Sequence, residues 1–110
     1  PARCRRAPLA GLARLDDAAF RERFSGSPIK RIGRDRFVRN VMIAIGNSGD
    51  AALVDIVRER LEDASPLVRG MAAWAARRLM TPADFIAARA RCLAREDDDE
   101  VRAEWDEATP

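Results

Sequence analysis

The chain lacks several residue types, and each absence excludes a kind of chemistry or fold. It has no histidine, so the most common general base and the most common metal ligand are both missing. It has no tyrosine, and aromatic residues make up only 5% of its 110 residues, which leaves Ala, Leu, Val and Ile to fill the core. This composition favours helices packed closely on helices, in one domain with one modest core.

The two cysteines, Cys4 and Cys92, stand 88 positions apart, and no C-x-x-C spacing occurs. The sequence therefore offers neither a zinc site nor a complete iron–sulfur site. We expect two free thiols in a reducing cytosol, and hence a cytoplasmic protein; a disulfide between them is the alternative.

Long apolar segments are also missing. No apolar run approaches 18 residues, so we expect no membrane-spanning helix, and we find no signal peptide. Because the chain begins with Pro1 rather than Met, we expect it to be a fragment of a longer protein.

The net charge of +2 conceals an asymmetry along the chain. Residues 1–39 carry eleven Lys or Arg against four acids, a net charge of +7, whereas residues 40–110 carry nine against fourteen, a net charge of −5. A basic first part followed by an acidic remainder suggests an anionic partner for the first part. The alternative is that the charges are simply solvated.

Apolar spacing and capping residues predict a succession of helices and no strand. Ser65-Pro66 and Thr81-Pro82 each place a capping side chain before a proline at the first helical position. Asp35 is expected to cap the third helix, whose buried stripe is predicted to be Phe37, Val41, Ala44 and Ile45. The predicted helices cover, approximately, residues 9–15, 16–24, 35–47, 51–62, 66–79, 82–94 and 97–108.

One pattern recurs: a capping residue, a Val three positions later, and then an Arg. Its copies are Asp35-x-x-Val38-Arg39, Ser65-x-x-Val68-Arg69 and Asp98-x-x-Val101-Arg102, at spacings of 30 and 33 residues. A helix-pair period of this size is typical of an α-solenoid. We therefore predict an all-α HEAT-like solenoid of about three helix pairs, with residues 1–8 as a linker, 9–34 as short helices and a basic loop, and 35–110 as repeats.

The pattern is similar to the second helix of HEAT repeats, and this resemblance implies a structural role for its members. In such repeats the arginine and the capping residue bond to their equivalents in adjacent repeats. Arg39 matches Arg69 and Arg102. It is therefore expected either to support packing or to face a ligand.

A cluster of cations precedes the first repeat helix. Lys30, Arg31 and Arg34 lie in or beside a predicted loop, from which long side chains can reach successive phosphates. Because Gly33 has no side chain, the backbone of a bound partner could approach the chain closely at this position. Asp35, as the cap, would place the positive end of the helix dipole beside these cations.

The following helix carries a polar row. Arg36, Asn40, Ile43 and Asn47 are spaced i, i+4, i+7 and i+11, so they share one outward face. The alternatives are that Arg36 pairs with a neighbouring acid, that Asn40 points inward, and that Asn47 only ends the helix. The candidate residues for contacting such an anionic partner are Lys30, Arg31, Arg34, Arg36, Arg39, Asn40 and Asn47; no catalytic or metal-binding residue is expected.

The segment from Gly26 to Asp50, GSPIKRIGRDRFVRNVMIAIGNSGD, resembles the C-terminal region of bacterial epoxyqueuosine reductases. The similarity extends upstream through PLAGLARLDDAAFRERF and downstream into the repeats. It implies a longer enzyme that binds cobalamin and two [4Fe–4S] clusters and reduces epoxyqueuosine to queuosine at the wobble position of tRNA. This chain would be its monomeric accessory domain, which helps hold the anticodon stem-loop beside the catalytic and ferredoxin-like domains.

Neither Cys4 nor Cys92 matches a cluster ligand of that family, so this chain is expected to have no cofactor and no reductase activity of its own. Five phosphate contacts would give a slope of log K against log[salt] of roughly −3.5 to −4.5. The alternative function is a HEAT-repeat protein-interaction module without RNA contact. Trp74 is expected in the core, with stacking on a base as its alternative.

Overall fold

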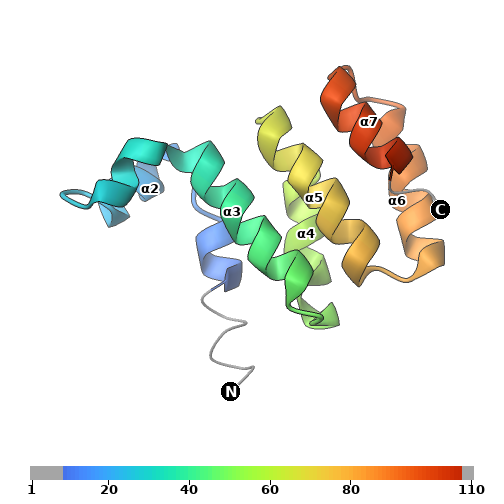
Figure 1. The fold of residues 1–110 in the computed structure, drawn as a ribbon, viewed down its shortest axis with the longest axis horizontal. Coiled ribbons are helices and arrows are strands. Elements are labelled where there is room, and N and C mark those ends of the chain that lie inside the picture. Colours follow the sequence, from blue (N-terminus) through green and yellow to red (C-terminus); the bar gives the residue numbers. More distant parts are fainter. Residues whose placement is uncertain (1–8, 108–110) are drawn as a thin grey trace.

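The computed structural model describes residues 9–107, which are helical and contain no strand (Figure 1). The all-α prediction is confirmed for this range, while the predicted linker over residues 1–8 lies outside it. Its helices are residues 9–13, α2 (Asp17–Arg23), the 3₁₀ helix η1 (Pro28–Ile32), α3 (Arg34–Asn47), the 3₁₀ helix η2 (Ala51–Leu53), α4 (Val54–Arg60), α5 (Pro66–Leu79), α6 (Pro82–Leu93) and α7 (Asp99–Glu107).

The helices form two layers of a short solenoid. Helices α3, α5 and α7 lie side by side in one layer, and residues 9–13, α4 and α6 lie behind them (Figure 1). Helix α5 is central, because it packs against α3, α4 and α7. The three helix pairs predicted from the repeat are thus present, in a body of 42 × 35 × 16 Å.

Two of the three predicted repeat caps are confirmed. The Ser65 hydroxyl accepts a hydrogen bond from the amide of Val68, and the Asp98 carboxylate accepts one from the amide of Val101, at 3.5 and 3.0 Å. The prediction for Asp35 is wrong. Helix α3 begins one residue earlier, with Gly33 as its N-cap at a φ of 83°, a conformation that suits glycine. The Asp35 carboxylate bonds instead to the guanidinium of Arg34.

The buried face of α3 is rotated from the predicted stripe. Val38, Met42 and Ile45 are fully buried with Val41, whereas Ala44 is exposed. Phe37 is half-buried because it faces α2 rather than α5, and its ring packs on Phe20 and Phe24 with centroids 5.4 and 4.9 Å away. This aromatic cluster attaches α2 to the first repeat helix.

A buried carboxylate joins the first two repeats. Asp63, whose side chain is 4% exposed, accepts two hydrogen bonds from the guanidinium of Arg34, at 2.9 and 2.7 Å, and one from Arg60 at 3.2 Å. It also accepts the backbone amide of Ser65. The Nε of Arg34 donates to the carbonyl of Leu15 at 2.7 Å. The interaction therefore connects the N-terminal segment, α3 and the loop before α5.

The next repeat contains the same arrangement. Arg69 on α5 forms a two-pronged ion pair with Glu96, at 2.9 Å for each bond, and Glu96 accepts the backbone amide of Asp98. Asp63 and Glu96 both stand two residues before the cap of the following helix. An arginine on α3 thus binds the loop before α5, and an arginine on α5 binds the loop before α7.

Removing the Asp63 carboxylate should destabilise the protein strongly, because Arg34 would keep a buried charge without its partner. We expect Asp63→Ala to lower the free energy of unfolding by about 3 kcal/mol or more. Glu62→Ala is the matched control: its pair with Arg95 is exposed on both sides and should contribute less than about 1 kcal/mol. Urea denaturation measures both, and equal losses would contradict this account.

The two buried acids should also make stability depend on acid pH. Burial opposes ionisation of Asp63 and is the largest single influence on its pKa, but the hydrogen bonds from Arg34 and the Ser65 amide, with the charges of Arg34 and Arg60, together hold that pKa below its usual value. The hydrogen bond from Arg69 likewise lowers the pKa of Glu96. A lowered folded-state pKa contributes stability that is present above about pH 4 and is lost as the pH falls through the folded-state value. Urea titrations at decreasing pH should show this decline, and Asp63→Ala should make it shallower.

Candidate nucleic-acid interface

Lys30 and Arg31 lie on η1, a turn of 3₁₀ helix rather than the predicted loop. Ser27 caps it, accepting the amide of Ile29 at 3.2 Å. Both cations are exposed and, with residues 26–28, line a shallow depression of about 570 Å³. A short capped helix holds its backbone in place, so these two side chains project from a defined position.

Exposed cations without a partner gather at this end of the molecule. Within residues 9–107, five Lys or Arg side chains have no hydrogen bond or ion pair: Arg23, Lys30, Arg31, Arg36 and Arg91. The first four belong to α2, η1 and the first turns of α3, whereas Arg91 is on α6. The alternative considered for Arg36, pairing with a neighbouring acid, therefore does not occur in the described part of the chain.

Arg34 does not belong to this group, contrary to the prediction. Its side chain is only 11% exposed and is held by Asp63 and by the carbonyl of Leu15. The hydrogen bond with Asp63 raises the pKa of Arg34 further, so the guanidinium stays charged and paired. Arg34 therefore has a structural role: it joins the start of α3 to Asp63, which lies 29 residues later in the chain.

Arg39 departs from its counterparts in the repeat. Arg69 donates to the carbonyls of Asp63 and Ala64. Arg102 donates to the carbonyl of Leu93, at the end of α6, and to that of Glu96, at 2.9 and 2.8 Å. Arg39 makes no such bond in the described structure, and its guanidinium contacts only the side-chain oxygen of Asn40, at 3.2 and 3.3 Å. The repeat arginine of α3 is therefore available to a ligand.

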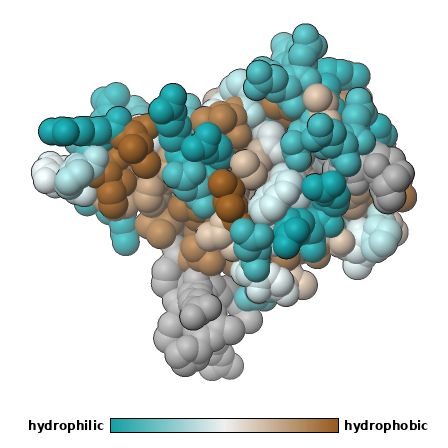
Figure 2. Space-filling model, viewed as in Figure 1, coloured by the Kyte–Doolittle hydropathy of each residue, from teal (hydrophilic) through white to brown (hydrophobic). Residues whose placement is uncertain are grey.

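A groove of about 670 Å³ runs between α3, α5 and α7. Its α3 side presents Arg39, Ile43 and Asn47, and its α5 side is largely apolar. Figure 2 shows apolar atoms between these two helices and a second apolar area near α2. The structure thus brings Arg39 together with Asn47, while Lys30, Arg31 and Arg36 lie outside the groove and Asn40 is exposed beside it.

The α7 side of the groove is acidic. Asp98, Glu100 and Glu104 line it opposite the α3 residues. Burial raises the pKa of Glu104, and the neighbouring charge of Glu107 adds to this effect. The groove therefore has the cation of Arg39 and the amide of Asn47 on one side and carboxylates on the other.

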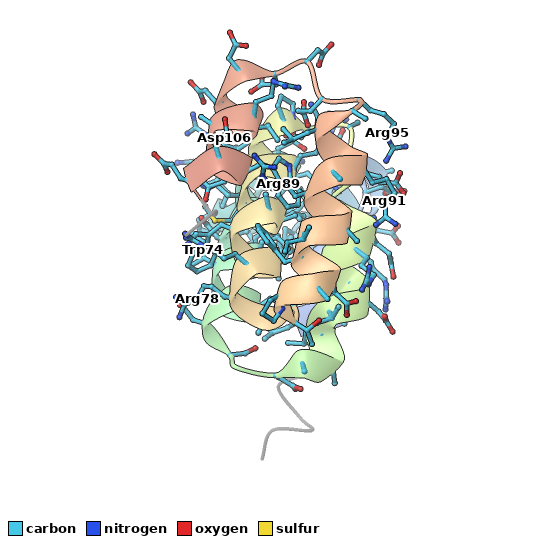
Figure 3. All side chains as sticks on the ribbon, turned by 90° about the vertical axis from the view of Figure 1, so that its right-hand side faces the viewer. Trp74, Arg78, Arg89, Arg91, Arg95 and Asp106 are labelled. Atoms are coloured by element: carbon cyan, nitrogen blue, oxygen red, sulfur yellow. The ribbon has the colours of Figure 1, made fainter. Side chains whose placement is uncertain are left out.

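Trp74 on α5 is half-buried at the groove rather than in the core. Its ring lies against Gly46 of α3, where no larger residue fits. The guanidinium carbon of Arg78 is 5.1 Å from the ring centroid, and the Nε of Arg78 donates to the carbonyl of Gly46 at 3.0 Å. Trp74 and Arg78 project on one side of the molecule, opposite Arg91 and Arg95 (Figure 3). A glycine within the apolar segment of α3 was the sequence signal for this contact.

Metal and cluster binding find no support in the described residues. No group of three Cys, Asp or Glu side chains in residues 9–107 is arranged to hold a metal ion. Cys92 is a free, buried thiol whose pKa is raised by burial, and Cys4 lies outside the described range. These residues do not fit an iron–sulfur cluster. None of the described helices has the length and apolar character that crossing a membrane requires.

A family model described as HEAT repeats matches residues 35–108. The chain belongs to the HEAT-repeat family. The match covers α3 to α7, which are the helices that form the two ion-paired repeats and the groove.

Among curated proteins, this HEAT-repeat chain is 45% identical over 83 residues to an epoxyqueuosine reductase of Alicycliphilus denitrificans, covering 64% of the chain and 23% of that relative. It is 39% identical over 70 residues to the epoxyqueuosine reductase of Xanthomonas campestris, covering 63% of the chain and 20% of the relative. The chain thus spans about a fifth of the length of these relatives.

Solved structures give the same result. A crystal structure of epoxyqueuosine reductase with an epoxyqueuosine-modified tRNA-Tyr stem loop superposes with a TM-score of 0.83 at 27% identity, covering 91% of this chain and 27% of that one. The epoxyqueuosine reductase of Bacillus subtilis gives a TM-score of 0.82 over the same shares at the same identity. The resemblance stated from residues 26–50 is confirmed.

Adding a methyl group at Gly46 should disturb the contact between α3 and α5, because it would overlap the ring of Trp74. We expect Gly46→Ala to cost about 1–3 kcal/mol of unfolding free energy and to change the fluorescence of the tryptophan. Gly70→Ala is the control. The methyl group added at Gly70 would meet only Val101, at 3.9 Å, and would therefore fit. Because alanine lowers the backbone entropy of the unfolded chain, Gly70→Ala should stabilise the folded protein by about 0.5 kcal/mol. A stable Gly46→Ala with unchanged emission would contradict this packing.

Proposed function

We propose that this chain is the tRNA-binding accessory domain of an epoxyqueuosine reductase and contacts the anticodon stem-loop. The observation that carries the proposal is the group of unpartnered cations at the α2–η1–α3 end, of which Lys30, Arg31 and Arg36 are the principal phosphate contacts. The relationship to epoxyqueuosine reductases, one of which was crystallised with a tRNA stem loop, supports the choice of RNA.

The polar side chains next to these cations extend the proposed contact. Arg39, Asn40 and Asn47 are on the same outward side of α3, where amides serve sugar hydroxyls and base edges and the guanidinium serves a phosphate. Arg34 is not a contact in this proposal, because Asp63 holds it. Four cationic contacts remain, for which the slope of log K against log[salt] is roughly −2.8 to −3.6.

The reductase chemistry belongs to the longer protein in this proposal. The family resemblance implies cobalamin and two [4Fe–4S] clusters, and reduction of the epoxide at the wobble position. Since the described residues of this chain do not fit a cluster, catalytic and ferredoxin-like domains would hold those groups. The accessory domain then increases the effective concentration of the tRNA at the catalytic pocket.

A protein-interaction module without RNA contact is the second candidate. The groove favours it, because its α5 side is apolar and includes Leu67, which is 41% exposed. The unpartnered cations favour RNA, since they lie outside that groove and no described acid neutralises them.

Charge reversal at the cationic end should weaken RNA binding. We expect the double variant Lys30→Glu with Arg36→Glu to lose roughly tenfold or more in affinity for an anticodon stem-loop, and its salt slope to fall to roughly −1.4 to −1.8 because two phosphate contacts are removed. Fluorescence anisotropy of a labelled stem-loop at several salt concentrations measures both quantities.

Arg91→Glu is the matched control for this experiment. Arg91 is also exposed and has no partner among the described residues, but it lies on the opposite side of the molecule from Trp74 and Arg78 (Figure 3). Its reversal should leave the slope unchanged. Equal losses for Arg91→Glu and the double variant, or no salt-sensitive binding by the unmodified chain, would show that the cationic end is not a specific RNA site.

A further inference from the structure

The indole of Trp74 lies at the groove, beside the polar row of α3. It is half-buried and lines the groove together with Ile43 and Asn47. One edge of the ring rests on Gly46, and Arg78 stacks on it while bonding to the Gly46 carbonyl. The ring is therefore fixed before any ligand arrives, so little conformational entropy is lost on stacking.

The groove has room and polarity for a planar, uncharged group. Its volume of about 670 Å³ exceeds what a side chain or a nucleobase requires, and Asn47 offers an amide donor and acceptor beside the ring. The carboxylates of Glu100 and Glu104 on the opposite wall repel phosphate but accept hydrogen bonds from amino groups.

These charges fix the direction in which a nucleic acid would enter. Arg39 attracts a phosphate to the α3 rim, and the acidic α7 wall excludes phosphates from the groove itself. A strand that follows the cations along α3 would thus keep its backbone on the rim and turn a base inward. Aromatic side chains stack on unpaired bases in this way in many RNA-binding proteins.

We propose that Trp74 is a stacking platform for one unpaired base of the bound RNA, with Asn47 contacting the edge of that base and Arg39 its phosphate. The inference rests on the proposed function, since it requires that RNA follows α3. It assigns to the groove a role distinct from that of Lys30, Arg31 and Arg36: they bind any phosphate backbone, whereas the groove selects unpaired nucleotides.

Two RNA probes test the proposal: an anticodon stem-loop, which has unpaired bases, and a blunt duplex of the same stem, which has none. Trp74→Ala should weaken binding of the stem-loop by roughly 5- to 150-fold and leave binding of the duplex nearly unchanged. Trp74→Phe, which keeps an aromatic ring and the packing on α3, should retain most of the affinity. Lys30→Glu with Arg36→Glu should weaken both probes.

Intrinsic fluorescence gives a second readout that does not depend on the stability of Trp74→Ala. The chain has two tryptophans and no tyrosine, and Trp105 is 1% exposed. The stem-loop should therefore quench emission through Trp74, and Trp74→Phe should abolish the quenching while the protein still binds. The duplex should quench weakly or not at all.

The outcomes separate this inference from the proposed function. Stem-loop binding without quenching, or equal losses of Trp74→Ala for both probes, overturns the stacking and leaves the RNA-binding function intact. Failure of both RNAs to bind overturns both. Quenching by a peptide of alternating lysine and leucine, but not by the stem-loop, shows that the groove accepts protein instead and also overturns the proposal.

Discussion

Asp63 holds a buried negative charge between the guanidinium groups of Arg34 and Arg60, and three parts of the chain meet there. An isolated carboxylate at this depth would be costly, and the two cations together with the Ser65 amide offset that cost. Because hydrogen bonds are directional, those between Arg34 and Asp63 fix the position of α3 relative to the loop before α5. The hydrophobic contacts between α3 and α5 then form at one relative position of the two helices, and other registers between them are disfavoured.

The second copy, Arg69 with Glu96, continues the same arrangement toward α7. Both ion pairs lie at the ends of the helices, so they leave the outward sides of α3, α5 and α7 free. The groove follows from this arrangement, because three parallel helices held at their ends expose the side chains along their length. Arg39 lines the groove, and Arg34 rather than Arg39 makes the connection to the next repeat.

The starts of α5 and α6 could be predicted from the sequence because their determinants are local. Ser65-Pro66 and Thr81-Pro82 satisfy the first turns that follow them, whatever the rest of the chain does. The role of Arg34 could not be predicted in this way, since its partner lies 29 residues later. The sequence nevertheless contains a pattern that indicates the partner of Arg34: Asp63 and Glu96 each stand two residues before a helix cap. Trp74 was assigned to the core because its neighbours are alanines; its half-exposure follows from the tertiary position of Gly46.

Residues 1–39 carry a net charge of +7 and residues 40–110 one of −5, so the charge along the chain is unevenly distributed. Unpartnered cations occupy the α2–η1–α3 end, and Asp97 to Glu100 stand in sequence at the start of α7, at the other end of the long dimension (Figure 1). In the field of a polyanion such a body experiences a torque before it makes any contact, so it would arrive with α3 leading. The acids near α7 thereby influence the rate of productive encounters without touching the ligand, and that influence weakens as salt shortens the range of the field.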